Sequence, residues 1–216
     1  MHNESFRLLG LDYVYLCFDV NEETLPAAVA GLKTCGIRGF NLTMPNKNKI
    51  VELLDELSPE AQLIGAVNTV LNDNGKLIGY NTDGYGFMQS VRDAGHDITG
   101  KNITVMGVGG ASMAICAQSA LDGAASVHIF ARRTSRYWNR TQKFAENLSA
   151  KTGCQVCLFD NDDHTALRDS IAQSYLLINA TSVGMVPDID DTIIKDTSLF
   201  LSLIHISEPT RHSLIS

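Results

Sequence analysis

The chain has 216 residues, of which 44% are hydrophobic and 19% charged, a composition ordinary for globular proteins and sufficient for one large domain or two small ones. A net charge of -7 argues against nucleic-acid binding by bulk electrostatics, because no basic excess exists to neutralise phosphates, but it does not exclude a local anion site. No run is long and apolar enough to span a bilayer, and the N-terminus MHNESFRLLG lacks a signal-peptide pattern.

The first 80 residues alternate between strand-like and helix-like patterns. The predicted elements, in chain order, are a strand over 12–19, a helix over 22–34, a strand over 39–43, a helix over 47–57, and strands over 66–71 and 76–80 joined by a turn at 72–75. This alternation indicates an α/β fold.

The second half continues the alternation after a predicted helix over 85–94 and a linker over 95–101. The predicted strands are 102–106, 126–130, 155–159 and 176–180, and the predicted helices are 112–121, 138–152 and 167–174. We therefore predict two α/β domains with a boundary between residues 86 and 100.

Five cysteines occur at irregular spacing, and in the absence of a secretion signal we expect reduced thiols in a cytoplasmic protein. Cys154 and Cys157 form a C-x-x-C pair, which is found in redox motifs and in halves of zinc sites. The alternative, which we favour, is that both belong to a buried strand. No second C-x-x-C or histidine pair completes a metal site, so we expect no bound metal.

The stretch MGVGGAS, residues 106–112, lies between a predicted strand and a predicted helix. Gly107, Gly109 and Gly110 would let the backbone turn tightly and approach a pyrophosphate, which the N-terminus of the helix would attract. Ser112 replaces the third glycine of the G-x-G-x-x-G pattern, a change that a small residue can accommodate. The alternative is a tight turn with no ligand.

A basic turn follows the next predicted strand, where a protein that binds NAD usually has an acidic residue for the ribose 2′-hydroxyl. This chain has Arg132 and Arg133 there, and guanidinium groups suit a 2′-phosphate. The turn therefore favours NADP, with NAD as the second choice. The alternative is a solvated basic loop.

Lys47 and Asp83 each follow a predicted strand of the first half, where open sheets bind their ligands. A lysine beside a carboxylate can relay a proton to or from a hydroxyl that becomes a carbonyl. Four further side chains could orient ring hydroxyls, namely Asn41, Thr43, Asn68 and Asn81. Considered singly, Lys47 could be a surface charge and Asp83 a helix N-cap.

Five motifs together resemble the shikimate dehydrogenase family over about residues 1–200. The motifs, in chain order, are NLTMPNK (41–47), GAVNT (65–69), NTDG (81–84), GVGGA (107–111) and NATSVGM (179–185). The segment LGLDYVY and the ARR turn look most like the quinate/shikimate dehydrogenase branch. The resemblance implies an N-terminal α/β substrate-binding domain over residues 1–90 and an incomplete NAD(P)-binding Rossmann domain over residues 91–200.

The resemblance also implies roles for individual residues. Lys47 and Asp83 would form the catalytic pair, and Asn68 and Asp83 would bind ring hydroxyls with Thr43 and Asn41 nearby. The implied cofactor-binding residues are Gly107, Gly109, Gly110 and Ala111 at the pyrophosphate, Arg132 and Arg133 at the adenosine ribose, and Thr181, Ser182 and Met185 towards the nicotinamide. The implied reaction is reversible NADP-linked hydride transfer between shikimate and 3-dehydroshikimate, with quinate as a possible second substrate, by a monomer or homodimer.

The chain departs from the family pattern at both ends. Members begin with a strand and a Ser-x-Ser-Pro loop and continue with further strands and a helix, so we expect a truncated enzyme with impaired turnover. Residues 201–216 follow no period, and we expect a non-native tail there, the alternative being a natural C-terminus. Two other functions stay open: a non-catalytic NADP-binding remnant, and a related enzyme such as an aminoshikimate or methylenetetrahydrofolate dehydrogenase, although NLTMPNK and NTDG disfavour the folate enzyme.

Overall fold

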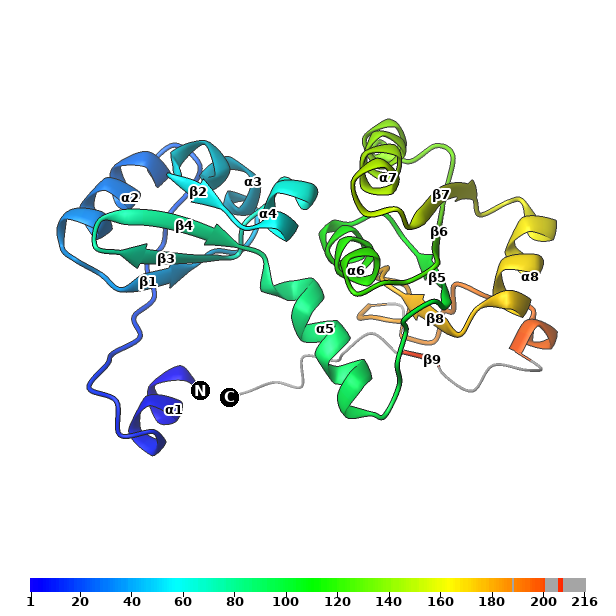
Figure 1. The fold of residues 1–216 in the computed structure, drawn as a ribbon, viewed down its shortest axis with the longest axis horizontal. Coiled ribbons are helices and arrows are strands. Elements are labelled where there is room, and N and C mark those ends of the chain that lie inside the picture. Colours follow the sequence, from blue (N-terminus) through cyan, green and yellow to red (C-terminus); the bar gives the residue numbers. More distant parts are fainter. Residues whose placement is uncertain (188, 201–205, 208–216) are drawn as a thin grey trace.

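The computed structural model describes residues 1–187, 189–200 and 206–207, and it contains two separate β-sheets with helices packed against each. The strands of the first sheet come from the N-terminal half and those of the second from the C-terminal half (Figure 1). The predicted α/β class is confirmed, and the helix α5 (Thr82–Asp93) connects the two sheets.

The first sheet has four strands in the order β1-β3-β4-β2. Its strands are β1 (Gly39–Asn41), β2 (Glu56–Leu57), β3 (Thr69–Asp73) and β4 (Lys76–Tyr80). β3 pairs antiparallel with β1 and β4, whereas β2 is parallel to β4. Asn74 and Gly75 join β3 to β4 with φ angles of 51° and 92°, because a tight hairpin turn needs positive φ at both central positions. The first core cluster contains Leu25, Ile50, Val67 and Val70.

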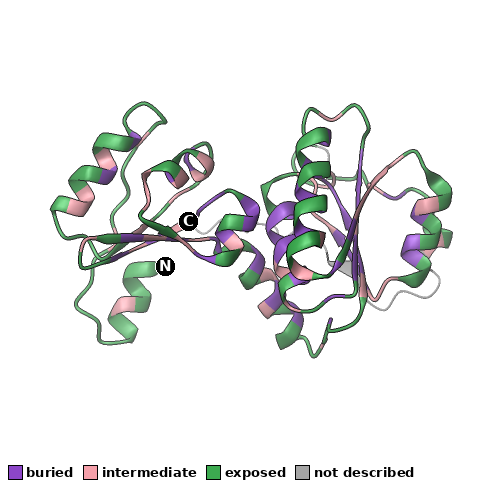
Figure 2. Ribbon diagram, turned by 45° about the horizontal axis from the view of Figure 1, so that its top comes forward, coloured by how far each residue is buried: buried purple, intermediate pink, exposed green. Residues whose placement is uncertain are grey.

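The predicted strand over 12–19 is wrong. Residues 10–20 form no helix or strand, and they follow a short helix, α1 (His2–Leu8), that the sequence did not predict. Val14, Leu16 and Phe18 are each more than half exposed, and Figure 2 shows the whole region as mostly exposed. No residue from 12 to 19 is therefore buried, and only Tyr15 among them is partly buried.

The other helices of the first half differ in length from the predictions. The helix predicted over 22–34 is α2 (Leu25–Thr34), and the one predicted over 47–57 divides into α3 (Asn46–Lys49), a 3₁₀ turn η1 (Ile50–Leu53) and the short strand β2. An unpredicted helix, α4 (Pro59–Ile64), begins at Ser58, whose hydroxyl accepts a hydrogen bond from Ala61 N, and ends at the left-handed Gly65. The strand predicted over 66–71 begins later, at Thr69.

The second sheet is entirely parallel, with strand order β7-β6-β5-β8-β9. Its strands are β5 (Asn102–Met106), β6 (Ser126–Ala131), β7 (Gln155–Asp160), β8 (Leu176–Asn179) and β9 (Ile206–Ser207), and its helices are α6 (Gly110–Leu121), α7 (Trp138–Thr152), α8 (His164–Gln173) and the 3₁₀ turn η2 (Thr197–Phe200). Most of these agree with the predictions to within three residues. The expected non-native tail, residues 201–216, lies outside the described residues except for β9.

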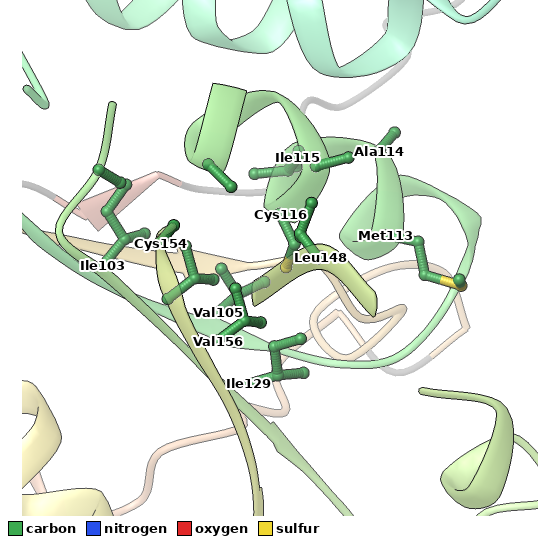
Figure 3. Packing of buried hydrophobic residues seen from close by; sticks show 14 of the residues in the cluster. Ile103, Val105, Met113, Ala114, Ile115, Cys116, Ile129, Leu148, Cys154 and Val156 are labelled. Atoms are coloured by element: carbon green, nitrogen blue, oxygen red, sulfur yellow. The ribbon is translucent and has the colours of Figure 1, made fainter. Parts of the chain in front are cut away.

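Two core clusters cover the two faces of this parallel sheet. On one face α6 and α7 pack over Ile103, Val105 and Ile129 (Figure 3), and on the other face Leu167 and Ile171 of α8 join a separate cluster. The larger cluster also includes Leu63 and Ile64 of α4 and Met88 and Val91 of α5. Side chains that precede the second sheet in sequence are thus part of its core.

Candidate active site

Three polar side chains of the first half meet at one point. The Lys47 Nζ atom donates a hydrogen bond of 2.7 Å to Asp83 Oδ2, and Asn68 Nδ2 donates one of 2.7 Å to Asp83 Oδ1. Both oxygens of the Asp83 carboxylate are therefore held by donors. The side chains of Lys47 and Asp83 are 21% and 38% exposed, so the pair is open to a ligand on one side.

The backbone of the first sheet fixes this cluster. Val67 N donates a hydrogen bond to Lys47 O at 2.8 Å. Because Val67 directly precedes Asn68, this bond holds α3 close to Asn68. Asn68 N donates to Tyr80 O, and Leu42 N donates to Asn68 O. Asn68 is therefore tied by its backbone to the ends of both neighbouring strands, and its side chain is only 8% exposed. Asn68 directly precedes β3, Asp83 lies in the first turn of the helix after β4, and Lys47 lies in the short helix after β1, so the sheet brings the three groups together.

Asn81 stabilises the backbone next to the cluster and does not face a ligand. This differs from the expectation that it orients ring hydroxyls. It is 3% exposed, and its amide donates to Ala66 O at 3.1 Å. Its Oδ1 atom accepts from Asp83 N, so Asn81 is the N-cap of α5 and Asp83 lies within the first turn. Asp83 itself is not the N-cap, and its carboxylate is left for Lys47 and Asn68.

Two hydroxyls that the sequence analysis did not single out complete the network. Asn68 Oδ1 accepts hydrogen bonds from Thr69 Oγ1 at 2.9 Å and from Thr82 N at 3.0 Å, and it also lies 3.2 Å from Thr82 Oγ1. Asn41 Nδ2 donates to Thr69 Oγ1 at 3.0 Å, so Asn41 reaches Asp83 only through intermediates. Thr43 is exposed in the loop before α3.

This arrangement suits proton transfer at a hydroxyl. An ammonium and a carboxylate in direct contact can pass a proton to and from a third oxygen placed beside them, and the amide of Asn68 keeps the carboxylate in one orientation. A ligand with several hydroxyls would meet an ammonium donor, a carboxylate acceptor and further threonine hydroxyls within one site. The cluster therefore fits a polyhydroxylated substrate whose hydroxyl gains or loses a proton.

A cavity of about 900 Å³ lies at the carboxyl ends of the parallel strands of the second sheet, where such sheets bind nucleotides. The lining residues are Gly107–Gly109, Phe130–Arg132, Thr134–Tyr137, Asn161, Ala180–Val183 and Asp191–Ile193. Of the predicted cofactor residues, Gly107, Gly109, Arg132, Thr181 and Ser182 line it. Its size and its glycine-rich and cationic wall suit a dinucleotide.

The remaining predicted cofactor residues are outside this lining. Gly110 and Ala111 lie in the first turn of α6. The free backbone N–H groups of this turn point towards the glycine loop that precedes the helix. The guanidinium of Arg133 lies 4.7 Å from the ring centroid of Trp138, a cation–π contact. Met185 is 42% exposed in the loop after β8.

Gly107 and Ser112 explain the sequence of the glycine loop. Gly107 has φ of +111°, and a Cβ atom there would lie 2.8 Å from Thr181 Cγ2 and 2.9 Å from Ala180 O, so only glycine fits. Ser112, at the position of the usual third glycine, is 1% exposed and donates its hydroxyl to Gly107 O at 2.6 Å. The serine thus stabilises the turn that the first glycine makes.

Comparison with known proteins identifies the family. A sequence profile described as the shikimate dehydrogenase substrate binding domain matches residues 1–70. The shikimate dehydrogenase (NADP(+)) of Listeria innocua is 46% identical over 219 residues, covering 100% of this chain and 75% of that protein. The chain belongs to the shikimate dehydrogenase family.

Solved structures of this family share the fold. Shikimate 5-dehydrogenase from Listeria monocytogenes in complex with shikimate and NAD has a TM-score of 0.89 and 47% identity, covering 92% of this chain and 68% of that one. A shikimate dehydrogenase in complex with NADP+ has a TM-score of 0.74 and 39% identity, covering 90% of this chain and 65% of that one. The resemblance inferred from the five motifs is confirmed.

Parts of the dinucleotide cavity of this family member were not predicted from the sequence. Asn161 directly follows β7, so its place at a strand end was a usable signal, and its Oδ1 atom is buried without a hydrogen-bond partner in the described part of the chain. Tyr137 and the segment 191–193 also line the cavity. That segment comes from an irregular loop far along the chain, for which the sequence carries no periodic signal.

In the C-x-x-C motif of this shikimate dehydrogenase family member, Cys157 lies in β7 and Cys154 directly precedes the strand. The expectation that both belong to a buried strand is met only in part, because Cys157 is half-buried. Cys154 is buried, and burial raises the pKa of its thiol to about 11, which disfavours the reactive thiolate. Among residues 1–187, 189–200 and 206–207, no three histidine, cysteine or acidic side chains gather as a metal site would require. No helix in the same ranges has the length and apolarity needed to cross a membrane.

Proposed function

We propose that this protein catalyses the reversible NADP-linked interconversion of shikimate and 3-dehydroshikimate, a step in the synthesis of chorismate and the aromatic amino acids. The observation that carries the proposal is the contact of Lys47 Nζ with Asp83 Oδ2 at 2.7 Å, with Asn68 holding the other carboxylate oxygen. Membership of the shikimate dehydrogenase family supports it, because relatives named for this activity are 46% identical across the chain.

Lys47 and Asp83 would manage the proton of the reacting hydroxyl. When shikimate is oxidised, the hydroxyl proton passes to the Lys47–Asp83 pair as the carbon–oxygen bond becomes double. NADP+, when bound, accepts the hydride that leaves the same carbon. In the reverse direction the Lys47 ammonium gives a proton to the carbonyl oxygen while Asp83 holds the lysine in place. Asn68, Asn41 and Thr43 would orient the remaining ring hydroxyls.

The second half would hold the cofactor. We assign the pyrophosphate to Gly107, Gly109, Gly110 and Ala111, because close backbone approach and the α6 N-terminus both favour phosphate oxygens. Arg132 lines the cavity, and its guanidinium suits the 2′-phosphate that distinguishes NADP from NAD. Thr181 and Ser182, at the end of β8, would face the nicotinamide side.

We further propose the division of labour between a substrate-binding part over residues 1–90 and a cofactor-binding part over residues 91–200. The partners would be small molecules, with quinate as a second substrate, and not nucleic acid or a membrane. The net charge of -7 is consistent with this choice. We also propose a cytoplasmic monomer or homodimer, which light scattering of the purified chain would test.

The decisive experiment compares Lys47→Ala with Lys49→Ala. Lys49 lies two residues away on the same short helix, but it pairs with Glu52 at 3.2 Å instead of Asp83. With shikimate and NADP+, we expect Lys47→Ala to lower kcat by about 10²–10⁴-fold, the usual contribution of a positioned acid–base group. Lys49→Ala should retain the parental rate, and NADP affinity should be unchanged in both.

A different outcome favours the non-catalytic alternative. If the parent chain binds NADP yet oxidises neither shikimate nor quinate, and Lys47→Ala changes nothing measurable, the protein is a cofactor-binding remnant. Equal losses in the two lysine variants would instead show that charge near α3, and not the Lys47–Asp83 contact, supports the reaction.

A further inference from the structure

Helix α5 carries Asp83 at one end and lies along the second half of the protein for its whole length. Its buried residues Gly84, Met88 and Val91 recur at helical spacing and face the core that α6 shares. Met88 is fully buried, and its Sδ atom accepts a hydrogen bond from Ser119 Oγ of α6 at 3.5 Å. The residue after Asp83 therefore belongs to a helix–helix contact and not to the substrate site.

Of the two glycines of α5, Gly84 and Gly86, it is Gly84 that lies against α6. A Cβ atom at Gly84 would lie 2.2 Å from Ala114 O, 2.8 Å from Ala114 C and 2.9 Å from Gln118 Cβ. Two of these three atoms are backbone, so they cannot rotate away. An ordinary carbon–oxygen contact is about 3.3 Å, so a side chain at Gly84 would separate the helices by about 1 Å.

The other side of the contact leads to the cofactor loop. Ala114 lies one turn after Gly110, the first residue of α6, and Gly107 and Gly109 of the preceding loop line the dinucleotide cavity. Asp83 is thus adjacent to the contact between Gly84 and Ala114 on the α5 side, and the cofactor loop lies one helical turn from it on the α6 side. A shift at this contact changes the separation between the two halves of the active site.

We propose that Gly84 is a positioning residue: the absence of a side chain lets α5 lie against Ala114, and this contact sets where Asp83 and Lys47 stand relative to the cofactor loop. The inference rests on the proposed dehydrogenase function. Hydride transfer depends steeply on the alignment of donor and acceptor, and a misplacement of about 1 Å can lower a rate about 10²-fold. Gly84 touches no reacting atom and acts only through Asp83.

The same helix offers a matched control. Gly86 is exposed, and a Cβ atom there would meet nothing within 4 Å. Gly84→Ala and Gly86→Ala therefore make the same chemical change in one helix with the same gain in helix propensity. Only Gly84→Ala introduces the clash with Ala114.

For Gly84→Ala we expect kcat for shikimate oxidation to fall about 10²-fold, with the affinity for NADP, measured by fluorescence titration, within about twofold of the parent. The deuterium isotope effect at the reacting carbon should rise, because hydride transfer becomes the slow step. Gly86→Ala should match the parent in all three measurements. A purely structural role for Gly84 would lower the melting temperature but leave the rate and isotope effect of the folded protein unchanged, which would overturn the proposal.

A second variant and a crystal structure test the positioning role when Gly84→Ala does not fold or the chain is inactive. If Gly84→Ala does not fold, Met88→Ala replaces it, because this change loosens the contact between α5 and α6 without a clash. We expect the same loss of kcat at unchanged NADP affinity. An unchanged kcat would contradict the positioning role of Gly84. If the parent and Gly86→Ala are both inactive with shikimate, the proposed function fails. A crystal structure of Gly84→Ala, or of Met88→Ala where that variant replaces it, then decides the positioning role. The role is refuted if Asp83 keeps the position relative to Gly107 and Gly109 that it has in the parent.

Discussion

Replacing Asn68 by aspartate tests whether the hydrogen bond from the Asn68 amide to the Asp83 carboxylate stabilises the protein. Asn68→Asp keeps the shape of the side chain, but it removes the donor that lies 2.7 Å from Asp83 Oδ1 and puts a second carboxylate in its place. Lys47 keeps its contact with the other oxygen of Asp83, so the two carboxyl groups of the variant would lie next to each other.

The expected cost follows from the geometry. Two unit charges 2.7 Å apart repel by about 6 kcal/mol at an effective dielectric constant of 20 and by about 1.5 kcal/mol in bulk water. Asp83 is 38% exposed, which places the pair between these limits. We expect the free energy of unfolding at pH 7 to fall by about 2–4 kcal/mol. The loss should shrink towards pH 4, where one shared proton restores a hydrogen bond between the two groups.

Urea denaturation followed by circular dichroism, at pH 7 and pH 4, measures this effect. The matched control is Asn72→Asp in β3, the strand that directly follows Asn68. Asn72 is similarly buried at 7%, and its amide donates to Ile37 O and not to a carboxylate. It loses a hydrogen bond without gaining a carboxylate neighbour at that distance. Equal losses of stability with the same dependence on pH in the two variants would show that the hydrogen bond from Asn68 to Asp83 has no special effect.

Three further outcomes follow from other parts of the structure. Gly107→Ala should lower the melting temperature and weaken NADP binding, because φ is +111° and Thr181 and Ala180 leave no room for a Cβ atom. Gly109→Ala should not lower the melting temperature, because a Cβ atom at Gly109 would meet no atom within 4 Å. In a thiol-labelling assay at pH 7 the exposed Cys35 should react at once, and Cys116 only on unfolding, because burial raises its pKa to about 12. Burial lowers the pKa of His128, so the unfolded state binds its proton first as pH falls below about 6.5. Stability should therefore drop over that range, and His128→Gln should flatten the drop in urea titrations at pH 7 and pH 5.

The second half of the fold was predictable because local signals there agree with the tertiary structure. Its strands are mostly apolar and mostly buried, as expected for a parallel sheet covered on both faces, and glycines mark several element ends. Residues 12–19 show the limit of such reasoning. Their alternation favours a strand, but strand propensity reflects packing against neighbours, and this segment forms no ladder in the described structure.

The site was predictable in its members but not in its connections. Lys47 and Asp83 could be found because each follows a strand and carries a charged group, and Asn68 because it lies in the GAVNT motif. Asn81 was misjudged because an asparagine before a helix serves equally well as a cap or as a ligand donor, and only its 3% exposure decides between these roles. Sequence spacing also could not reveal that Arg133 contacts Trp138 while Arg132 lines the cavity.

The shared core has a consequence for recombining this enzyme with its relatives. Leu63, Ile64, Met88 and Val91 precede the second sheet in the chain, yet they pack in its core. A chimera joined at residue 90 would divide α5 and would pair the α4 and most of the α5 of one parent with the α6 of another. Mismatches would then fall on the contact between α5 and α6 that begins next to Asp83. Crossovers between β2 and α4 would avoid this, because both helices would then be inherited together with the partner against which they evolved.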